Sequence, residues 1–149
     1  MDVVAPLLDN ILATAEANLV ECNRPVALIS LTPGSEVAWD GCCDGELWAR
    51  VIDITPVSSS RNCDIDYILV TAGLGVVRCF SGLDTDGLAP TAAEMTADTV
   101  SMLADADALL RALQANSVTI GRGVPLGPSG LCGGFEWTFT ARLTLCPGC

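Results

Sequence analysis

The sequence predicts an α+β protein, a single domain over residues 1–149, in which one antiparallel-type sheet is flanked by two main helices. Two stretches carry apolar residues at helical spacing, and four others have the alternation or the β-branched composition of strands. Their order is helix, strand, strand, strand, helix, strand. Half of the 149 residues are hydrophobic, which is enough for one compact core covered by the helices.

The first part of the chain predicts one helix and two strands. In residues 4–19 apolar side chains recur every three or four positions, as on an amphipathic helix. An Asn-Arg-Pro break precedes an apolar run at 26–31, which predicts the first strand. Residues 46–55 predict the second strand, which we expect to stop at Pro56.

One further strand is predicted before the second helix, and an extended region and the last strand are predicted after it. Residues 63–80 form a long extended segment, in which Gly73 and Gly75 predict a bulge or a bend. Residues 118–120 open another extended region, and the turn-rich VPLGPSGLCGG separates it from the last strand. In that strand, residues 135–145, apolar and polar side chains alternate, so one face is expected in the core and the other in solvent.

The second helix gives the strongest local signal. Thr91 and Glu94 have the spacing of a capping box, and the helix is predicted to run to about residue 115. An apolar stripe that includes Met95, Met102, Leu103, Leu109 and Leu113 is expected to face the core. Three acids lie away from that stripe and are expected in solvent, namely Asp98, Asp105 and Asp107.

Composition and charge exclude several classes of function. Seven basic residues, all arginine, against 18 acidic ones give a net charge of −11, which disfavours clamping of nucleic acid. The chain has no histidine, so a Ser-His-Asp triad within it is impossible. Every apolar run is interrupted before the roughly 18 residues of a membrane span, and the N-terminus lacks the basic opening of a signal peptide. We therefore expect a soluble protein made in the cytoplasm.

Eight cysteines leave two chemical interpretations open. Four thiolates hold zinc tetrahedrally, and Cys-x-x-Cys is the usual half of such a site, so Cys42, Cys43, Cys146 and Cys149 are candidate ligands. Only one half of the usual spacing is present, and adjacent cysteines need an irregular loop to reach one ion. A disulfide oxidoreductase is disfavoured, because its Cys-x-x-Cys opens a helix and here the chain ends.

Disulfide bonds are the second interpretation. Once the protein leaves the reducing cytoplasm, we expect Cys146 or Cys149 to bond with Cys42, Cys43 or Cys132. The remaining cysteines lie in apolar strand or helix patterns and are expected to be small buried side chains, namely Cys22, Cys63 and Cys79.

Four stretches together resemble the neck proteins of long-tailed actinobacterial phages: GELWARVIDITP, LVTAGLGVVRCF, PTAAEMTADTVSMLADADALLRAL and VPLGPSGLCGGFEWTFTARL. The resemblance covers about residues 24–145 and is closest to a head-to-tail connector protein, or tail terminator. It implies an α+β fold and a hexameric ring that ends growth of the tail tube and docks to the head. It carries over no catalytic residues, so neither an enzyme nor a cofactor is expected. The stopper ring just above the terminator is the alternative.

As a virion protein assembled in the host cytoplasm, the chain is expected to contact its own copies, the major tail tube protein and a head-side connector or stopper protein, but no membrane. Genome DNA would pass through the channel without specific binding, because acidic walls repel it. The three tryptophans, Trp39, Trp48 and Trp137, are also candidate anchors of an interface between subunits, although core packing suits Trp137 better. Contacts between subunits are expected in the loops at 33–44 and 83–90, with Trp39, Asp40, Leu83, Asp84 and Asp86 as interface residues.

Two other classes of function fit the residues less well. A small Cys-rich metal-binding or redox protein is disfavoured by the missing histidine and the incomplete ligand spacing. An enzyme that uses Asp64 and Asp66 as paired carboxylates is disfavoured, because alternate positions on a strand suit a solvent face equally well.

Overall fold

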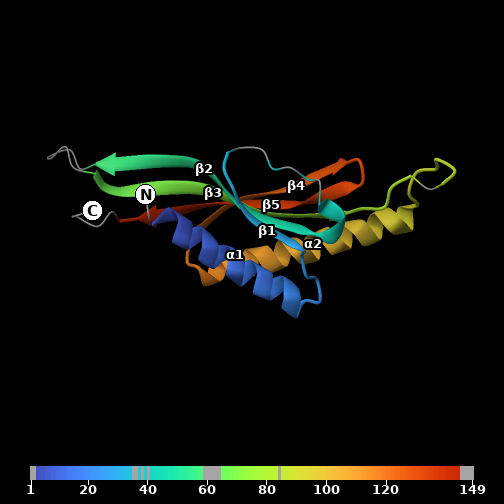
Figure 1. Cartoon of the computed structure of the whole chain (residues 1–149), viewed down its shortest axis with the longest axis horizontal. Coiled ribbons are helices and arrows are strands. Elements are labelled where there is room, and N and C mark those ends of the chain that lie inside the picture. The colour runs from blue at the N-terminus through green and yellow to red at the C-terminus, as the bar shows by residue number, and fades with distance from the viewer. Residues whose placement is uncertain are drawn as a thin grey trace.

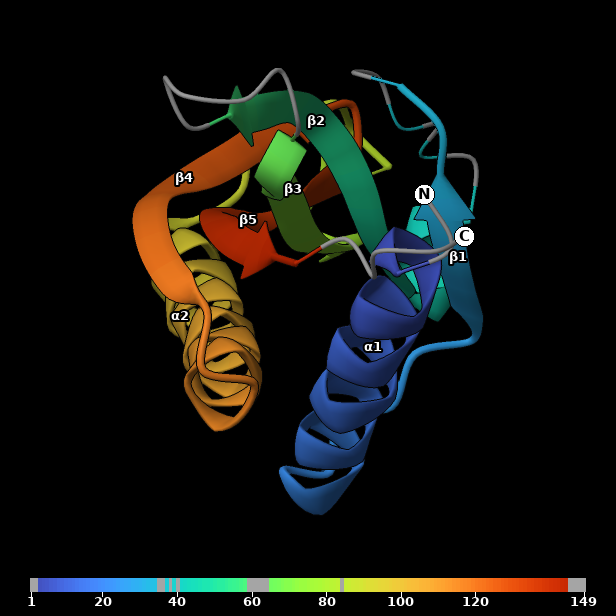
Figure 2. The same ribbon diagram turned by 90° about the vertical axis from the view of Figure 1, so that its left-hand side faces the viewer.

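Two helices lie against the same face of one five-stranded sheet in the computed structural model of the chain (Figures 1 and 2). The structure describes residues 3–34, 37, 39, 41–58, 65–83 and 85–144. Its elements are α1 (Val4–Glu21), β1 (Leu28–Thr32), the short 3-10 turn η1 (Cys42–Asp44), β2 (Glu46–Ser58), β3 (Ile65–Cys79), α2 (Ala92–Ala115), β4 (Thr119–Ser129) and β5 (Cys132–Leu143). The predicted α+β class is therefore confirmed.

The first helix forms as its apolar stripe predicts. Leu8, Ile11 and Leu19 are buried in the main core, whereas Glu16 between them is exposed. The chain leaves the helix at Asn23, which has a φ of 57°, a left-handed conformation that asparagine tolerates better than most residues. The predicted and observed ends of this helix agree within two residues.

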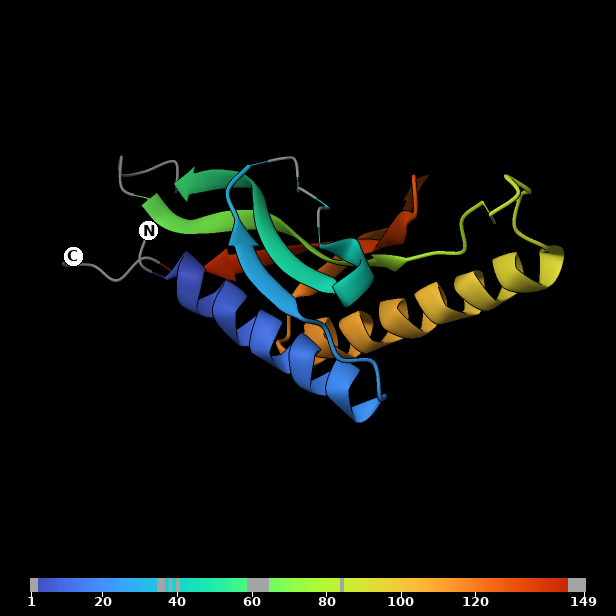
Figure 3. The ribbon, with the colours of Figure 1, turned by 45° about the vertical axis from the view of Figure 1, so that its right-hand side comes forward.

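The second helix begins at the predicted capping box. The Thr91 hydroxyl accepts the Glu94 backbone N–H at 3.3 Å, and the Glu94 carboxylate accepts the Thr91 backbone N–H at 2.7 Å. The apolar stripe reaches the core only in the second half of the helix, where Leu109 is fully buried. Met95 and Leu103, which we expected in the core, are each 53% exposed, because the first half of α2 extends beyond the sheet (Figures 1 and 3).

The capping box makes the stability of α2 dependent on pH. The hydrogen bonds from the Thr91 backbone and hydroxyl hold the pKa of Glu94 below its ordinary value of 4.5. A carboxyl whose pKa is lowered by folding contributes stability above its ordinary pKa and loses it as the pH falls through the folded value. At pH 7, Glu94→Ala is expected to lower Tm by about 2 °C. The gap from the wild type should close below about pH 4.5.

Thermal melts of both proteins between pH 3 and pH 7 check this prediction. Glu16→Ala, which removes an exposed glutamate from α1, is the control and should show no such closing gap. A Tm difference for Glu94→Ala that is constant across the range would contradict the proposed role of the charged carboxylate.

The sheet is mixed, which corrects the expected antiparallel type. The order is β1-β2-β3-β5-β4, and β1 runs parallel to β2 while the other neighbours are antiparallel. A parallel connection needs about a dozen residues, and the segment 33–45 supplies that length. β2 also continues past Pro56, which pairs with Ile68 of β3 in a part of β2 that β1 does not reach. Proline is tolerated where a strand is paired on one side only, so the expected end of the second strand at Pro56 was wrong.

Only the start of β4 was predicted, as the extended region that opens at residues 118–120, because the glycines and prolines in the rest of this fifth strand resemble a turn. It pairs antiparallel with β5 through the connection at 130–131, with two shifts of register. Gly123 lies against the rings of Phe135 and Trp137, and a Cβ at this position would come within 2.7 Å of both. The small residue therefore lets β4 approach the aromatic side chains of β5.

Gly73 and Gly75 do not mark a bulge. Both pair in regular register with β2, and the nearby shift of register lies in β2 at Ile52. A side chain at Gly75 would collide with the Trp48 ring, and one at Gly73 would come within 2.9 Å of the Glu136 carboxyl carbon. These glycines instead make room for two large side chains on the sheet face opposite the helices.

Part of that opposite face is covered, so the expectation of a solvent face for the last strand is wrong at Glu136, although it holds at Arg142, which is exposed. Glu136 is only 8% exposed, and its carboxylate accepts hydrogen bonds from the Trp48 indole at 3.1 Å and from the Arg50 guanidinium at 2.7 and 2.8 Å. The bonds to Glu136 raise the pKa of Arg50. A second, smaller apolar cluster lies on this face and comprises Cys42, Trp48, Val77, Val37, Trp39, Leu126 and Cys132.

Asp105 is likewise buried rather than solvated. It is 3% exposed and receives the guanidinium of Arg24 at 2.6 and 2.8 Å and that of Arg78 at 2.8 and 3.3 Å. These contacts join the segment that follows α1, the end of β3 and the middle of α2, and the bond to Asp105 raises the pKa of Arg24. Asp107, two residues further along the helix, is exposed as predicted.

Candidate functional site

The first half of α2 projects beyond the hydrophobic core of the subunit. Every buried residue of this helix lies between Asp105 and Leu113, and the preceding turns project past the sheet (Figures 1 and 3). Val100 and Leu103 on these turns are 62% and 53% exposed. A helix that continues for several turns without its own core to cover it is a natural contact element for another chain.

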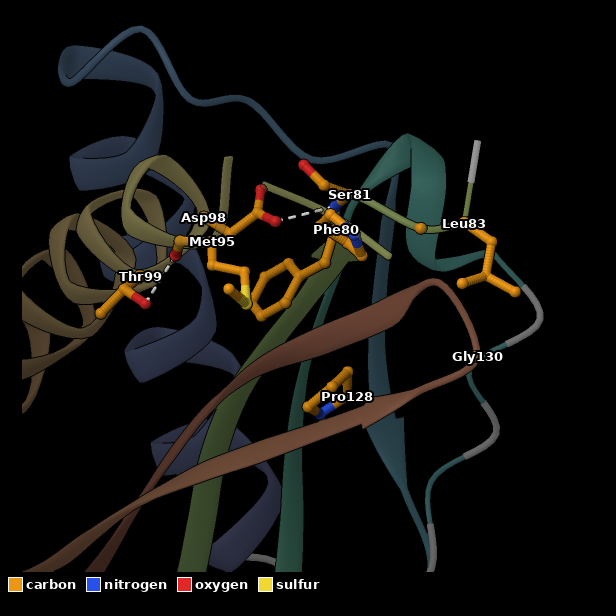
Figure 4. A pocket seen from close by; sticks show the side chains of 10 residues that line it. Phe80, Ser81, Leu83, Met95, Asp98, Thr99, Pro128 and Gly130 are labelled. Atoms are coloured by element: carbon orange, nitrogen blue, oxygen red, sulfur yellow. Dashed lines mark hydrogen bonds between the residues drawn. The ribbon is translucent and has the colours of Figure 1, made fainter. Parts of the chain in front are cut away.

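A cavity of about 430 Å³ lies between this half of α2 and the segment that follows β3. In Figure 4 the side chains of Phe80 and Met95 lie close together in it, with Pro128 of β4 across the opening. The lining is mostly apolar and comprises Phe80, Ser81, Gly82, Leu83, Pro90, Met95, Asp98, Thr99, Pro128 and Gly130. We refer to this cavity as the α2 pocket.

Polar contacts hold the α2 pocket in shape. The Asp98 carboxylate accepts the Ser81 backbone N–H at 2.8 Å, which ties the chain after β3 to α2 (Figure 4). Asp98 is therefore partly buried and bonded to the backbone, not simply solvated as expected. The Phe80 backbone N–H donates to the Leu131 carbonyl at 2.6 Å, which fixes the β4–β5 connection beside the same pocket.

Large exposed apolar side chains lie in the α2 pocket and in the two segments that contribute to its lining. Leu83 is 70% exposed, Leu88 64%, and Leu131, which packs over Gly82, is 50% exposed. Apolar side chains gathered at one place, unlike ones scattered singly, mark a contact surface. The α2 pocket with these rim residues is our candidate subunit interface.

A second exposed apolar surface lies on β1, an edge strand of the described sheet. Ile29 and Leu31, which are two positions apart and so lie on one face of the strand, are 41% and 40% exposed, and we call this pair the β1 surface. A cavity of about 420 Å³ adjoins it where Leu31 meets Val4 at the start of α1. Figure 3 shows β1 well away from the projecting half of α2, so the two surfaces are distinct.

The predicted interface residues fall into three groups. Leu83 lines the α2 pocket, and Asp86 is exposed in the same loop. Trp39 is half-buried against the apolar cluster on the sheet face opposite the helices. Asp40 and Asp84 lie outside the described residues. The exposed apolar residues of α2 and β1 were not predicted as interface candidates, because their spacing in the sequence is that of residues facing a protein core.

The other two tryptophans are not interface anchors within the described fold. Trp48 is 1% exposed and belongs to the outer cluster, so it cannot reach a neighbouring subunit. Trp137 is half-buried, and its indole donates to the Ala106 carbonyl at 2.9 Å, which links β5 to α2. Core packing was the better expectation for Trp137.

The cysteines form two disulfide bonds in the described part of the chain. Cys42 bonds with Cys132 across a Cα–Cα distance of 5.8 Å, and Cys43 bonds with Cys79 across 4.3 Å. The bonds thus tie η1 to the end of β3 and the start of β5. Cys42, Cys43 and Cys132, one of which we expected to bond with Cys146 or Cys149, are all bonded within these two disulfides instead, and Cys146 and Cys149 lie outside the described residues.

Two expectations about buried cysteines were wrong. Cys79 is exposed and crosslinked, and Cys22 is an exposed free thiol whose sulfur lies 3.1 Å from an Arg111 guanidinium nitrogen. Cys22 directly follows α1, and Cys79 is the last residue of β3. At the end of an element an apolar pattern no longer implies burial. Cys63 lies outside the described residues.

The buried acidic side chains in the described part of the chain stabilise the fold through ion pairs. Asp105 and Glu136 both form ion pairs with arginines, and neither lines the α2 pocket. Asp66, one half of the disfavoured carboxylate pair, is exposed, and Asp64 lies outside the described residues. Carboxylates committed to structural ion pairs are poor candidates for acid–base chemistry.

Comparison with known protein families gives no match to the sequence, and comparison with curated proteins gives none either. Among the helices of the described residues, none combines the length and the apolar character needed to cross a membrane.

Proposed function

We propose that the protein is a structural subunit of the neck of a long-tailed phage, a tail terminator that forms a hexameric ring. The ring caps the tail tube and joins it to the head, and the protein resides in the virion after assembly in the host cytoplasm. Its contacts are its own copies, the major tail tube protein and a head-side connector or stopper protein. The six-fold symmetry is the one that the sequence resemblance implies.

The observation that carries this proposal is the pair of separate apolar surfaces on one subunit. A closed ring needs heterologous contacts, in which one patch of a subunit meets a different patch of the next. The α2 pocket with Leu83 and the β1 surface with Ile29 meet this requirement, because both are apolar, exposed and apart. A two-fold dimer would need only one such patch.

The charge distribution supports a channel through which DNA passes. Three of the seven arginines, Arg24, Arg50 and Arg78, pair with the buried acids Asp105 and Glu136. The exposed surface is therefore poorer in positive charge than the composition suggests. A wall of this kind repels phosphate and lets the genome slide without binding.

Native mass spectrometry of the full chain, with electron microscopy of the same sample, tests the proposal. A closed ring of six subunits with a central channel is expected, either alone or on the end of assembled tail tubes. A chain that stays monomeric at high concentration, both alone and with tail tubes, would overturn the ring.

The stopper ring of the same neck is the second candidate, because the exposed surfaces suit either position. A phage that lacks the protein separates the two. Loss of a terminator leaves tube growth unchecked, so tails longer than normal are expected. Tails of normal length beside heads that fail to join them would instead support the stopper.

A further inference from the structure

Four cysteines from three elements meet at one point on the sheet face opposite the helices. Cys42 and Cys43 come from η1, Cys79 ends β3, and Cys132 begins β5. The sulfurs of Cys42, Cys43 and Cys79 all lie within 4.8 Å of one another, and Cys132 is bonded to Cys42. Cys79 and Cys132 are also directly opposite each other in the β3–β5 register, so their side chains leave the same face of the sheet.

The turn η1 lets two adjacent cysteines face the same point, which a strand would forbid. Its tight form is held by backbone hydrogen bonds from Asp44 to Gly41 and from Gly45 to Cys42, each 3.1 Å long. The Ala27 backbone N–H binds the carbonyls of Asp44 and Gly45 at 3.1 and 3.0 Å, which anchors the turn beside β1. The geometry therefore rests on hydrogen bonds that do not involve sulfur.

We propose that, when the thiols are reduced, Cys42, Cys43, Cys79 and Cys132 form a tetrahedral thiolate site for a soft divalent cation of the Zn²⁺ type. Tetrahedral Zn–S bonds of about 2.3 Å place the sulfurs roughly 3.8 Å apart. The sulfurs of Cys42, Cys43 and Cys79, which lie within 4.8 Å of one another, can reach this spacing with small movements, and Cys132 joins them once its bond to Cys42 is reduced. Sulfur-only ligands select zinc-like ions over the hard cations that prefer oxygen.

The surroundings suit such a site. Cys42 is 4% exposed and packs with Trp48 and Val77, so one side of the cluster is apolar. Cys43 and Cys79 are exposed, which gives a metal ion access from solvent. This set differs from the sequence candidates, because Cys79 and Cys132 take the places that had been considered for Cys146 and Cys149.

The two disulfides in the structure are the oxidised form of the same cluster. Starting from the metal-bound tetrathiolate, two molecules of a disulfide oxidant such as oxidised glutathione accept four electrons from the thiolates and four protons from solvent. Two protein disulfides form, four molecules of glutathione are released, and the divalent cation leaves. Metal retention and crosslinking are therefore mutually exclusive states, the first favoured in a reducing cytoplasm and the second in the released virion.

Titration of the reduced full chain with Co²⁺, in a phosphine reductant and without oxygen, tests the site. One Co²⁺ per chain is expected, with the visible bands of tetrahedral cobalt and an intense near-ultraviolet band from four thiolates. Added Zn²⁺ should displace it, and two equivalents of oxidised glutathione, added after the phosphine has been removed, should release it. The absence of tetrahedral thiolate bands in the wild type would overturn the proposal.

Variants identify the ligands. Cys43→Ser/Cys79→Ser removes two exposed ligands with little effect on the core, and it should weaken Co²⁺ binding by at least about 100-fold. The matched controls Cys22→Ser and Cys146→Ser/Cys149→Ser should keep the wild-type affinity and spectrum. Bands that survive the first variant, or that disappear in either control, would overturn the assignment. Circular dichroism of every variant confirms that the comparison is between folded proteins, and the result does not depend on ring formation.

Discussion

Asp105→Ala is expected to lower the free energy of unfolding by about 4 kcal/mol, because it leaves two arginines without their shared partner. The Asp105 side chain is 4% exposed, and the Arg24 and Arg78 side chains are only 22% and 19% exposed. Arg78 also donates to the backbone carbonyls of Arg24 and Pro25 at 2.6 and 2.9 Å, so it cannot leave for solvent without breaking those bonds. The loss is thus larger than that of a surface ion pair.

Urea unfolding of the wild type and the variant measures this difference. Asp107→Ala is the matched control, since it removes an acid from the same helix whose side chain is 63% exposed and pairs with Arg111 only at 3.4 Å. Its effect should stay within about 0.5 kcal/mol. If the two variants are equally stable, Asp105 does not organise the junction of α1, β3 and α2.

The helices could be predicted from the sequence because their signals are local. The stripe of α1 and the capping box of α2 depend only on residues three or four positions apart. The burial of Asp105 could not be predicted in this way. It depends on Arg24 and Arg78, which are 81 and 27 positions away. The spacing of acidic residues along α2 gives no information about these two arginines.

The sheet was less predictable, because strand pairing is a property of distant segments. Nothing in residues 28–32 distinguishes a parallel neighbour from an antiparallel one, and β4 is rich in the residues that usually form turns. Gly123 is required by the aromatic rings of β5, whereas Gly127 has a φ of 78°, a conformation that favours glycine. The fourfold cysteine cluster has the same origin, since only the β3–β5 register places Cys79 opposite Cys132.

The candidate interface could be predicted only in part. Leu83 was found because an apolar residue in a polar loop is conspicuous. Met95 was not predicted as an interface candidate. An apolar stripe on a helix has the same sequence pattern whether its own sheet or another subunit covers it. The difference lies in the length of α2 relative to the sheet, which no local pattern contains.

Leu83→Asp/Leu131→Asp is expected to abolish the ring at micromolar concentration, with association weaker by roughly 100-fold, or about 3 kcal/mol per contact. Both leucines lie beside the α2 pocket and are at least half exposed, so a charge costs the lone subunit little. In an assembled ring the same charge would be buried in an apolar contact without a partner, which carries a large desolvation cost. Sedimentation velocity measures the distribution of species.

The control for this experiment is Val20→Asp/Ile65→Asp, which adds the same two charges at exposed apolar positions away from both the α2 pocket and the β1 surface. It should leave the ring intact, because only buried contact surface penalises a charge strongly. A matching variant of the β1 surface, Ile29→Asp/Leu31→Asp, should dissociate the ring as the first variant does. Mixing the two defective proteins should then give short complexes rather than rings, since each keeps one good surface and heterologous contacts join unlike patches. Rings that survive the α2 pocket variant, or that fail equally in the control, would place the contact elsewhere on the subunit.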